Sequence, residues 1–224
     1  MTLVTSLLAA TGYGLVVAFT TMPVISIIAV LLGTKKTSNG VWLTIGYASG
    51  LAVVFVLAVA GVSELPWPHL RRPSGVFDVL AGILLVIVAG GWWLWSRRQP
   101  RAQARESDNR FMRWLASLGP TSCAMVGFQF GFHPENLVLT IATARTTIDL
   151  GWAMTLVVLA WFCLVGVSTV VGPTLMYASS GDRAAERLAT LRDWIRVHGP
   201  TLTVVVLLLA GAALIGLGVW RITA

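Results

Sequence analysis

Four consecutive residues, His133, Pro134, Glu135 and Asn136, place polar and ionisable groups inside an otherwise apolar stretch. A carboxylate at the centre of a bilayer costs at least about 3 kcal/mol on insertion scales, so it needs a function or a compensating partner. Two interpretations of Glu135 stay open. Either it is the anion that a helix N-terminus stabilises, or it is protonated and exchanges that proton in a working cycle. His133 either shares the proton or is a core histidine bonded to a carbonyl, and Asn136 can bond backbone groups freed beside a proline.

Two prolines lie at matching distances from the next basic residue. Pro23 precedes Lys35 by 12 residues, and Pro134 precedes Arg145 by 11. At 1.5 Å per residue, each proline is about 17 Å from its charged end, near the middle of a bilayer. Proline removes a backbone hydrogen bond, and such breaks are tolerated where they line a cavity or are buried in protein. We expect each span to be two half-helices, the second beginning at the proline; two ordinary proline kinks are the alternative.

The polar residues beside these prolines complete a candidate substrate or coupling site. Thr20 and Thr21 are expected to cap the break at Pro23, and Gly131 is expected to supply the bend before Pro134. The positive ends of the two second half-helices then point toward one centre, where unpaired N–H groups attract an anion. The predicted site consists of Thr20, Thr21, Pro23, His133, Pro134, Glu135 and Asn136.

The elements that position this site are membrane spans. Of the 224 residues, 56% are apolar and 11% are charged, whereas a soluble domain carries about 25% charged residues. Long uncharged stretches recur along the chain, each close to the length that crosses about 30 Å of hydrocarbon. They predict an all-α integral membrane protein with six transmembrane helices, at residues 7–32, 41–62, 76–96, 114–144, 150–178 and 200–221.

The basic residues orient these spans. With the N-terminus outside, three inner segments hold twelve of the sixteen Lys and Arg residues, around residues 35–36, 97–113 and 183–196. Since basic loops stay in the cytoplasm, we expect a multi-pass protein of the bacterial plasma membrane with both termini outside. The net charge of +7 is explained by these loops, so nucleic acid is excluded as a partner.

A weak internal repeat appears at an offset of 111 residues, where Phe19 matches Phe130 and Pro23 matches Pro134. It divides the chain into a three-helix repeat at residues 1–96, a basic cytoplasmic linker at 97–113 and a second three-helix repeat at 114–224. Because each half has an odd number of spans, the halves must be inverted relative to each other, which is a common plan of secondary transporters.

Residues 182–197 form an amphipathic segment with Ala184, Leu188, Leu191 and Ile195 on one face. We expect it to lie flat on the inner leaflet, where four arginines contact lipid; a solvated connector is the alternative. These arginines are Arg183, Arg187, Arg192 and Arg196.

Two segments resemble a known family. Met22-Pro23-Val24-Ile25 with residues 31–36 is similar to the opening of the actinobacterial Gap/Sap-type proteins, the glycopeptidolipid- or sulfolipid-addressing proteins of the lysine-exporter superfamily. Residues 127–144 resemble the family's second signature, usually Asn-Pro-Lys-Asn-Leu, which reads His133-Pro134-Glu135-Asn136-Leu137 here. His133 and Glu135 depart from that pattern, and Glu135 reverses a charge. The resemblance implies export across the plasma membrane, with envelope glycolipids as cargo.

We therefore expect an exporter for an envelope glycolipid or another lipid. Two alternatives are an exporter of a small solute, such as an amino acid or a metal ion, and a non-transporting accessory subunit of a lipid-export machine. The expected partners are membrane lipids, the lipid cargo and either a second copy of the chain or that larger machine. No catalytic residues, cofactor or metal site are expected, because no nucleophile–base pair, ligand cluster or phosphate loop occurs. Cys123 and Cys163 are expected to be packing residues.

Overall fold

The fold consists of helices throughout the part of the chain that the computed structural model describes, residues 3–34, 37–63, 75–98, 110–111, 113–115 and 117–223. No strand occurs in these residues, so the expectation of an all-α protein is confirmed. The helices are α1 (Leu3–Ala18), α2 (Thr21–Thr34), α3 (Thr37–Ser63), α5 (Gly75–Arg98), α7 (Pro120–Gly131), α8 (Pro134–Arg145), α9 (Trp152–Ser180) and α10 (Asp182–Thr223).

Three described segments are long and apolar enough to cross a membrane: Thr37–Val62, Trp152–Ser180 and Thr201–Trp220. A fourth is added if α1 and α2, which meet at an angle of 55°, count as one bent span. The apolar part of α5, Asp78–Leu94, is shorter, and α7 and α8 have 12 residues each. The chain is thus a membrane protein, and six spans remain a prediction.

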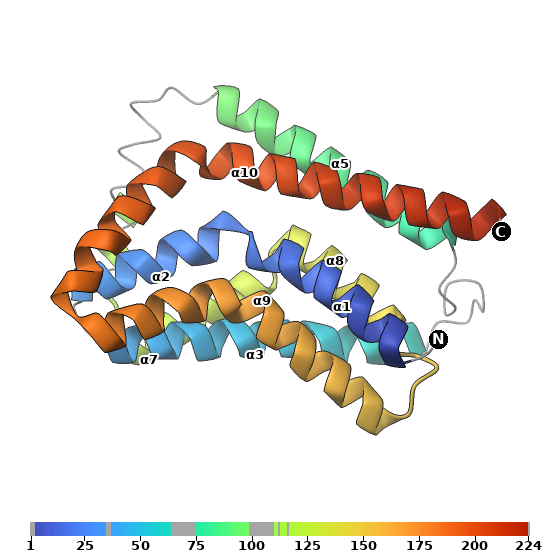
Figure 1. Ribbon diagram of the computed structural model, residues 1–224, viewed down its shortest axis with the longest axis horizontal. Coiled ribbons are helices and arrows are strands. Elements are labelled where there is room, and N and C mark those ends of the chain that lie inside the picture. Colours follow the sequence, from blue (N-terminus) through green and yellow to red (C-terminus); the bar gives the residue numbers. More distant parts are fainter. Residues whose placement is uncertain are drawn as a thin grey trace.

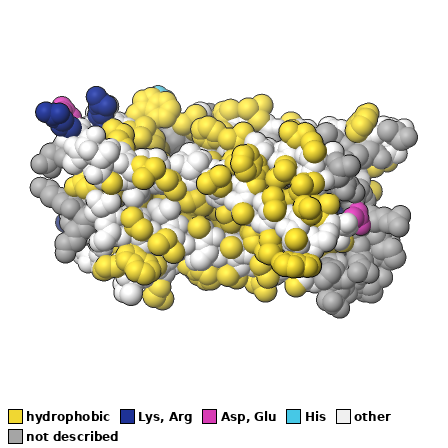
Figure 2. Space-filling view, turned by 60° about the horizontal axis from the view of Figure 1, so that its bottom comes forward, with side chains coloured by type: hydrophobic (Ala, Val, Ile, Leu, Met, Phe, Trp, Pro, Cys, Tyr) yellow, Lys and Arg dark blue, Asp and Glu magenta, His cyan; other side chains and the backbone are white. Residues whose placement is uncertain are grey.

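The helices run back and forth along the long axis of the molecule, and both termini lie at the same end (Figure 1). Hydrophobic side chains cover the middle of the surface, whereas Lys and Arg side chains gather at one end (Figure 2). An apolar middle with basic side chains at one end is the surface expected of a protein that lies in a bilayer.

Helices α3 and α7 pack backbone to backbone through small residues. Each carries a Gly-x-x-x-Gly motif, Gly46 with Gly50 on α3 and Gly127 with Gly131 on α7. A methyl group added to any of these glycines would collide with the backbone of the facing helix. The contacts run from Gly46 with Ala124 to Gly50 with Phe128, which makes the pair parallel. Small residues that let backbones approach are the usual means of helix association in membranes.

Helices α5 and α10 form a second close pair, which is antiparallel and lies along one side of the molecule (Figure 1). Gly75 faces Gly218 and Gly82 faces Gly211, and an added side chain would again meet backbone. The seven-residue spacing on both helices keeps the glycines on one face, since seven residues are close to two helical turns.

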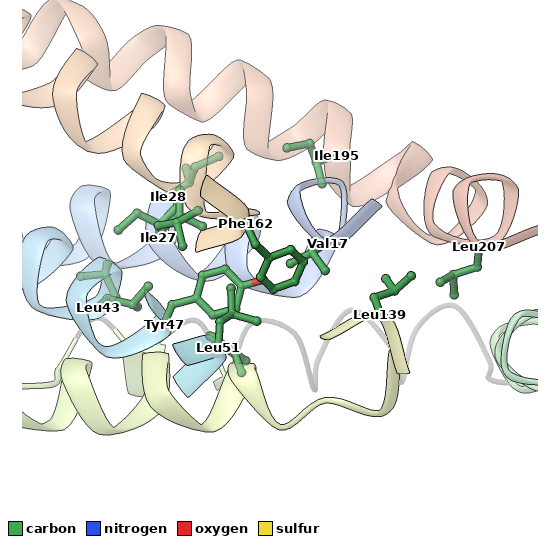
Figure 3. Packing of buried hydrophobic residues seen from close by; sticks show 14 of the residues in the cluster. Val17, Ile27, Ile28, Leu43, Tyr47, Leu51, Leu139, Phe162, Ile195 and Leu207 are labelled. Atoms are coloured by element: carbon green, nitrogen blue, oxygen red, sulfur yellow. The ribbon is translucent and has the colours of Figure 1, made fainter. Parts of the chain in front are cut away.

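Between these pairs lies a core of buried side chains from α1, α2, α3, α8 and α9 (Figure 3). The largest of them, Tyr47, Phe55 and Phe162, are almost completely buried, and the Phe55 and Phe162 rings lie 6.3 Å apart. This core surrounds the region in which α1 gives way to α2 and α7 gives way to α8.

The amphipathic segment 182–197 and the last predicted span are one continuous helix. We expected a separate surface helix at residues 182–197 and a span at 200–221, but α10 is one helix of 42 residues that continues through Pro200. Ala184, Leu188 and Ile195 are buried within the protein itself, whereas Leu191 is 39% exposed. An amphipathic pattern does not distinguish protein from lipid as the partner of its apolar face, and one proline kinks a helix without ending it.

Candidate functional site

The break between α7 and α8 lies halfway along 24 helical residues. Helix α7 ends at Gly131, and α8 begins at Pro134, its first helical position, with His133 in an extended conformation (φ −60°, ψ 142°) as the N-cap residue. Proline suits this position because the first N–H groups of a helix have no partner within it. Gly131 packs against the backbone of Gly50, which holds the end of α7 against α3.

The first break differs in position from its prediction. Helix α1 ends at Ala18 and α2 begins at Thr21, so Pro23 is the third residue of α2 and not its first. Any of the first positions accepts proline, since their N–H groups lack partners within the helix. The Thr20 hydroxyl donates to the Val17 carbonyl at 2.7 Å. The Thr20 side chain therefore bonds to the last turn of α1 instead of capping α2. The side chain of Thr21 lies outside the described residues.

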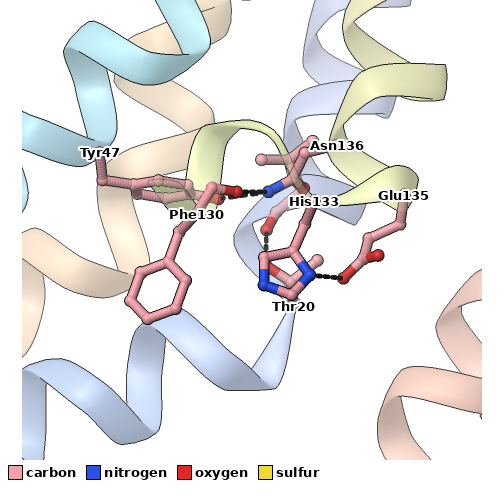
Figure 4. A network of polar contacts seen from close by, with 7 residues as sticks. Thr20, Tyr47, Phe130, His133, Glu135 and Asn136 are labelled. Carbon is pink, nitrogen blue, oxygen red and sulfur yellow. Dashed lines mark hydrogen bonds and ion pairs between the residues drawn. The ribbon is translucent and has the colours of Figure 1, made fainter. Parts of the chain in front are cut away.

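A buried tyrosine joins the two breaks. The Asn136 amide nitrogen donates to the Phe130 carbonyl at 2.8 Å, across the α7–α8 break, and lies 3.4 Å from the Tyr47 hydroxyl (Figure 4). The side chain of Thr20, at the end of α1, lies beside the same hydroxyl. Tyr47, on α3, thus lies between Thr20 and Asn136 at the centre of the molecule.

His133 and Glu135 point away from Tyr47 (Figure 4). The His133 Nδ1 and Glu135 Oε1 atoms lie 3.8 Å apart, and their side chains are 34% and 17% exposed. Glu135 is the second residue of α8, where the partial positive charge of the helix N-terminus favours an anion. The site therefore has a buried amide side and a partly open carboxylate side.

The open side borders a small hollow with about 20 Å³ of room, enough for one water molecule. Among the described residues, Glu135 supplies its only charged side chain. The lining comes from α2, α5, α8 and α10: Met22, Val88, Trp92, Glu135, Thr203 and Leu207. Glu135 thus faces the α5–α10 pair, while Asn136 faces the core.

The two helices that follow the breaks carry further polar atoms in the interior. Ser26 Oγ on α2, and Asn136 Oδ1 and Thr140 Oγ1 on α8, are buried without a hydrogen-bond partner in the described part of the protein. Unpaired buried polar atoms are uncommon in native proteins and mark positions that a water molecule, an ion or a ligand can serve.

The four arginines predicted to contact lipid lie on the first part of α10. Arg183 and Arg187 are exposed, Arg192 pairs with its neighbour Asp193 at 3.0 Å, and the side chain of Arg196 lies outside the described residues. This part of α10 is at the end of the molecule opposite the termini (Figure 1).

Within the described residues, no group of three His, Cys, Asp or Glu side chains is arranged to hold a metal ion. Cys123 is buried and Cys163 half-buried, and both are free thiols.

Sequence reasoning missed Tyr47, Trp92 and Thr203. Tyr47 carries a hydroxyl in the middle of the uncharged stretch 38–63, and a polar group at that depth is a usable signal. Trp92 lies next to Trp93 and Trp95 just before Arg97, a pattern typical of an interfacial aromatic belt rather than of a site. Thr203 gave no signal, because threonine is common in membrane helices.

Comparison with known proteins gives one match. The family model described as Sap, sulfolipid-1-addressing protein matches residues 11–220, which is nearly the whole chain. Neither the search of curated proteins nor the search of solved structures found a match.

Proposed function

Because the chain belongs to the Sap, sulfolipid-1-addressing protein family, we propose that it is a bacterial plasma-membrane transporter that exports a cell-envelope glycolipid or another lipid. Family membership indicates a lipid-related membrane function. The proposal adds that the protein exports its lipid and that it belongs to the lysine-exporter superfamily.

The observation that carries the proposal is the position of Glu135. It lies at the break between two helices of 12 residues each, 17% exposed, beside a hollow in an otherwise apolar surrounding. A helix break at membrane depth is tolerated where it lines a cavity or is buried, and an intramembrane carboxylate marks a transport pathway by default.

The pairing of the helices supports an inverted repeat. Helix α1 packs on α9 as α7 packs on α3, and α5 packs on α10, the last helix of the other half. Gly75 of α5 faces Gly218 of α10, and Gly82 faces Gly211. The first of these glycines on each helix thus faces the second on the other, as a twofold axis between the two helices requires. The closest pairings thus join residues 1–96 with residues 114–224, so the two proposed repeats pack together rather than forming separate bodies.

The proposed mechanism moves the α5–α10 pair against the remaining helices. The glycines hold α5 and α10 together as one unit, and the hollow beside Glu135 lies between this unit, α2 and α8. Opening that boundary would expose Glu135 to a lipid headgroup, as in transporters that rock one bundle about a midplane site. The proposal assigns no catalytic step to the chain.

The proposed orientation puts the basic end of the molecule in the cytoplasm and both termini outside. Arg183 and Arg187 lie at the end opposite the termini, and positive-inside placement gives that end to the cytoplasm. Membrane lipids and the cargo are the proposed partners, together with either a second copy of the chain or a larger export machine.

The test is lipid analysis of a strain that lacks the gene, with inner and outer lipid pools measured separately. The proposal predicts that one lipid class accumulates inside and falls outside, and that the restored gene reverses both changes. Unchanged lipids with altered efflux of an amino acid or a metal ion would instead establish the small-solute exporter. A lipid defect that the purified chain cannot correct in vesicles without another protein would establish the accessory subunit.

A further inference from the structure

The hollow beside Glu135 combines one anionic group with an aromatic ring. Of its six lining residues, Glu135 is the charged one, Thr203 and Trp92 carry one polar group each, and the other three, Met22, Val88 and Leu207, are apolar. No lysine, arginine or histidine lines it among the residues that the structure describes. The charge of the hollow itself is therefore negative, although the molecule carries a net charge of +7.

An ammonium group suits this arrangement in both size and chemistry. The room of about 20 Å³ fits a group the size of a water molecule. A carboxylate in apolar surroundings attracts a cation more strongly than the same carboxylate in water. An indole ring is the best aromatic partner for a cation. Trp92 on α5 and Glu135 on α8 both line the hollow, so a cation in it can contact both.

The position of the hollow favours a lipid as the source of that ammonium group. The hollow extends from Glu135, at the helix break, to Trp92 on α5. Trp92 precedes Arg98, the last residue of α5, by six residues, or about 9 Å of helix. The surface nearby is apolar, with Leu84 46% and Ile87 63% exposed on α5. A headgroup in the hollow can thus leave its acyl chain along the apolar surface.

We propose that this hollow binds the cationic amine headgroup of a lipid, held between the Glu135 carboxylate and the Trp92 ring. The proposal rests on the function proposed above, because it names the class of lipid that the exporter takes. An anionic group, such as the one that the word sulfolipid implies, would be repelled by Glu135. The carboxylate that departs from the family's usual lysine thus selects for the opposite headgroup charge.

The test is equilibrium binding to the full chain in nanodiscs, with radiolabelled oleylamine as the probe. Oleic acid and oleyl alcohol have the same chain length with an anionic and a neutral headgroup, and ethylamine has the amine without the chain. We expect saturable binding of labelled oleylamine. Oleic acid, oleyl alcohol and ethylamine should each displace it at least tenfold less well than unlabelled oleylamine does. Glu135→Gln should weaken oleylamine binding about tenfold and Trp92→Leu about threefold.

Matched controls separate the site from general membrane charge. Glu186→Gln and Trp194→Leu change the same residue types at exposed positions on α10 and should leave binding unchanged. Oleylamine binding no tighter than oleyl alcohol, or unchanged by Glu135→Gln in a variant that elutes as folded protein, would overturn the proposal. Tighter binding of oleic acid would also overturn it, while leaving lipid export intact. Ethylamine binding as tight as oleylamine would overturn the lipid assignment and favour a small cationic solute.

Discussion

The two helix breaks occupy equivalent places in the sequence, with Pro23 and Pro134 111 residues apart, but their surroundings differ. Val24 and Ile25 follow the first proline, whereas Glu135 and Asn136 follow the second. Thr20 stands where the other break has Gly131. The first break thus has apolar residues after its proline, and its Thr20 hydroxyl bonds to the end of its own helix. The second break has polar residues after its proline, packs against α3 and opens to a hollow.

In the proposed repeat, both copies thus keep a helix break, and only the second copy has a carboxyl group beside it. Both breaks leave backbone groups that need partners, and both reach Tyr47, through Thr20 and through Asn136. The carboxylate occurs on one side alone, where α8 offers its N-terminus and the hollow offers space. We call the second break the polar break, and the residue 111 positions earlier the counterpart of each of its residues. Replacing residues of the polar break by their counterparts tests whether the two breaks differ in function.

The largest effect is expected from Gly131→Thr, which introduces the counterpart Thr20. The added side chain would meet the backbone of Gly50 and force α3 and α7 apart. Overpacking of this kind costs about 3 kcal/mol or more. We expect little folded protein in size-exclusion chromatography of detergent extracts. Gly172→Thr is the control, because nothing lies within 4 Å of the position. Normal elution and melting of Gly131→Thr would contradict the close α3–α7 contact.

The next effect is on function alone. Glu135→Val introduces the counterpart Val24 and should reduce lipid export at least tenfold, while the melting temperature stays the same or rises because a carboxyl group leaves apolar surroundings. Adding Val24→Glu moves the carboxyl group to the other break and should not restore export. Export by this double variant at the wild-type level would show that the two breaks are interchangeable.

A moderate loss of stability is expected from Asn136→Ile, which introduces the counterpart Ile25. The Phe130 carbonyl loses its 2.8 Å bond, but the unpartnered Asn136 Oδ1 atom is removed as well. These opposing changes leave a net cost of about 1 kcal/mol, measurable as a lower melting temperature in detergent. No change in melting would mean that this bond does not hold the two sides of the break together.

The smallest effect is expected from His133→Met, which introduces the counterpart Met22. The His133 ring is 34% exposed and 3.8 Å from Glu135, and a partly exposed pair at that distance contributes less than about 1 kcal/mol. Melting should change by no more than one or two degrees, and export should stay within about threefold of wild type. A loss of export as large as that of Glu135→Val would show that His133 shares the work of the carboxyl group.

The sequence predicted the helical membrane class and the start of α8 at Pro134, because charge-free stretches and prolines act locally. It placed the first break at Pro23, two residues late, because several positions in a first helical turn accept proline. Tyr47 and Trp92 were not predicted as site residues, since their roles depend on which helices lie beside α8. The expected separation of the amphipathic segment from the last span was wrong, because one proline kinks a helix without ending it.

The central claim is that Glu135 in the polar break is the functional centre of the exporter. Its most direct test is Glu135→Gln in a strain that lacks the gene, with the outer lipid pool measured against wild type and the exposed control Glu186→Gln. Glutamine keeps the shape of the side chain and removes its charge. The account predicts that Glu186→Gln restores the outer pool, and that Glu135→Gln, at equal membrane abundance, leaves it as low as in the deletion strain. Full restoration by Glu135→Gln would contradict it, leaving Glu135 as a cap for the broken helix.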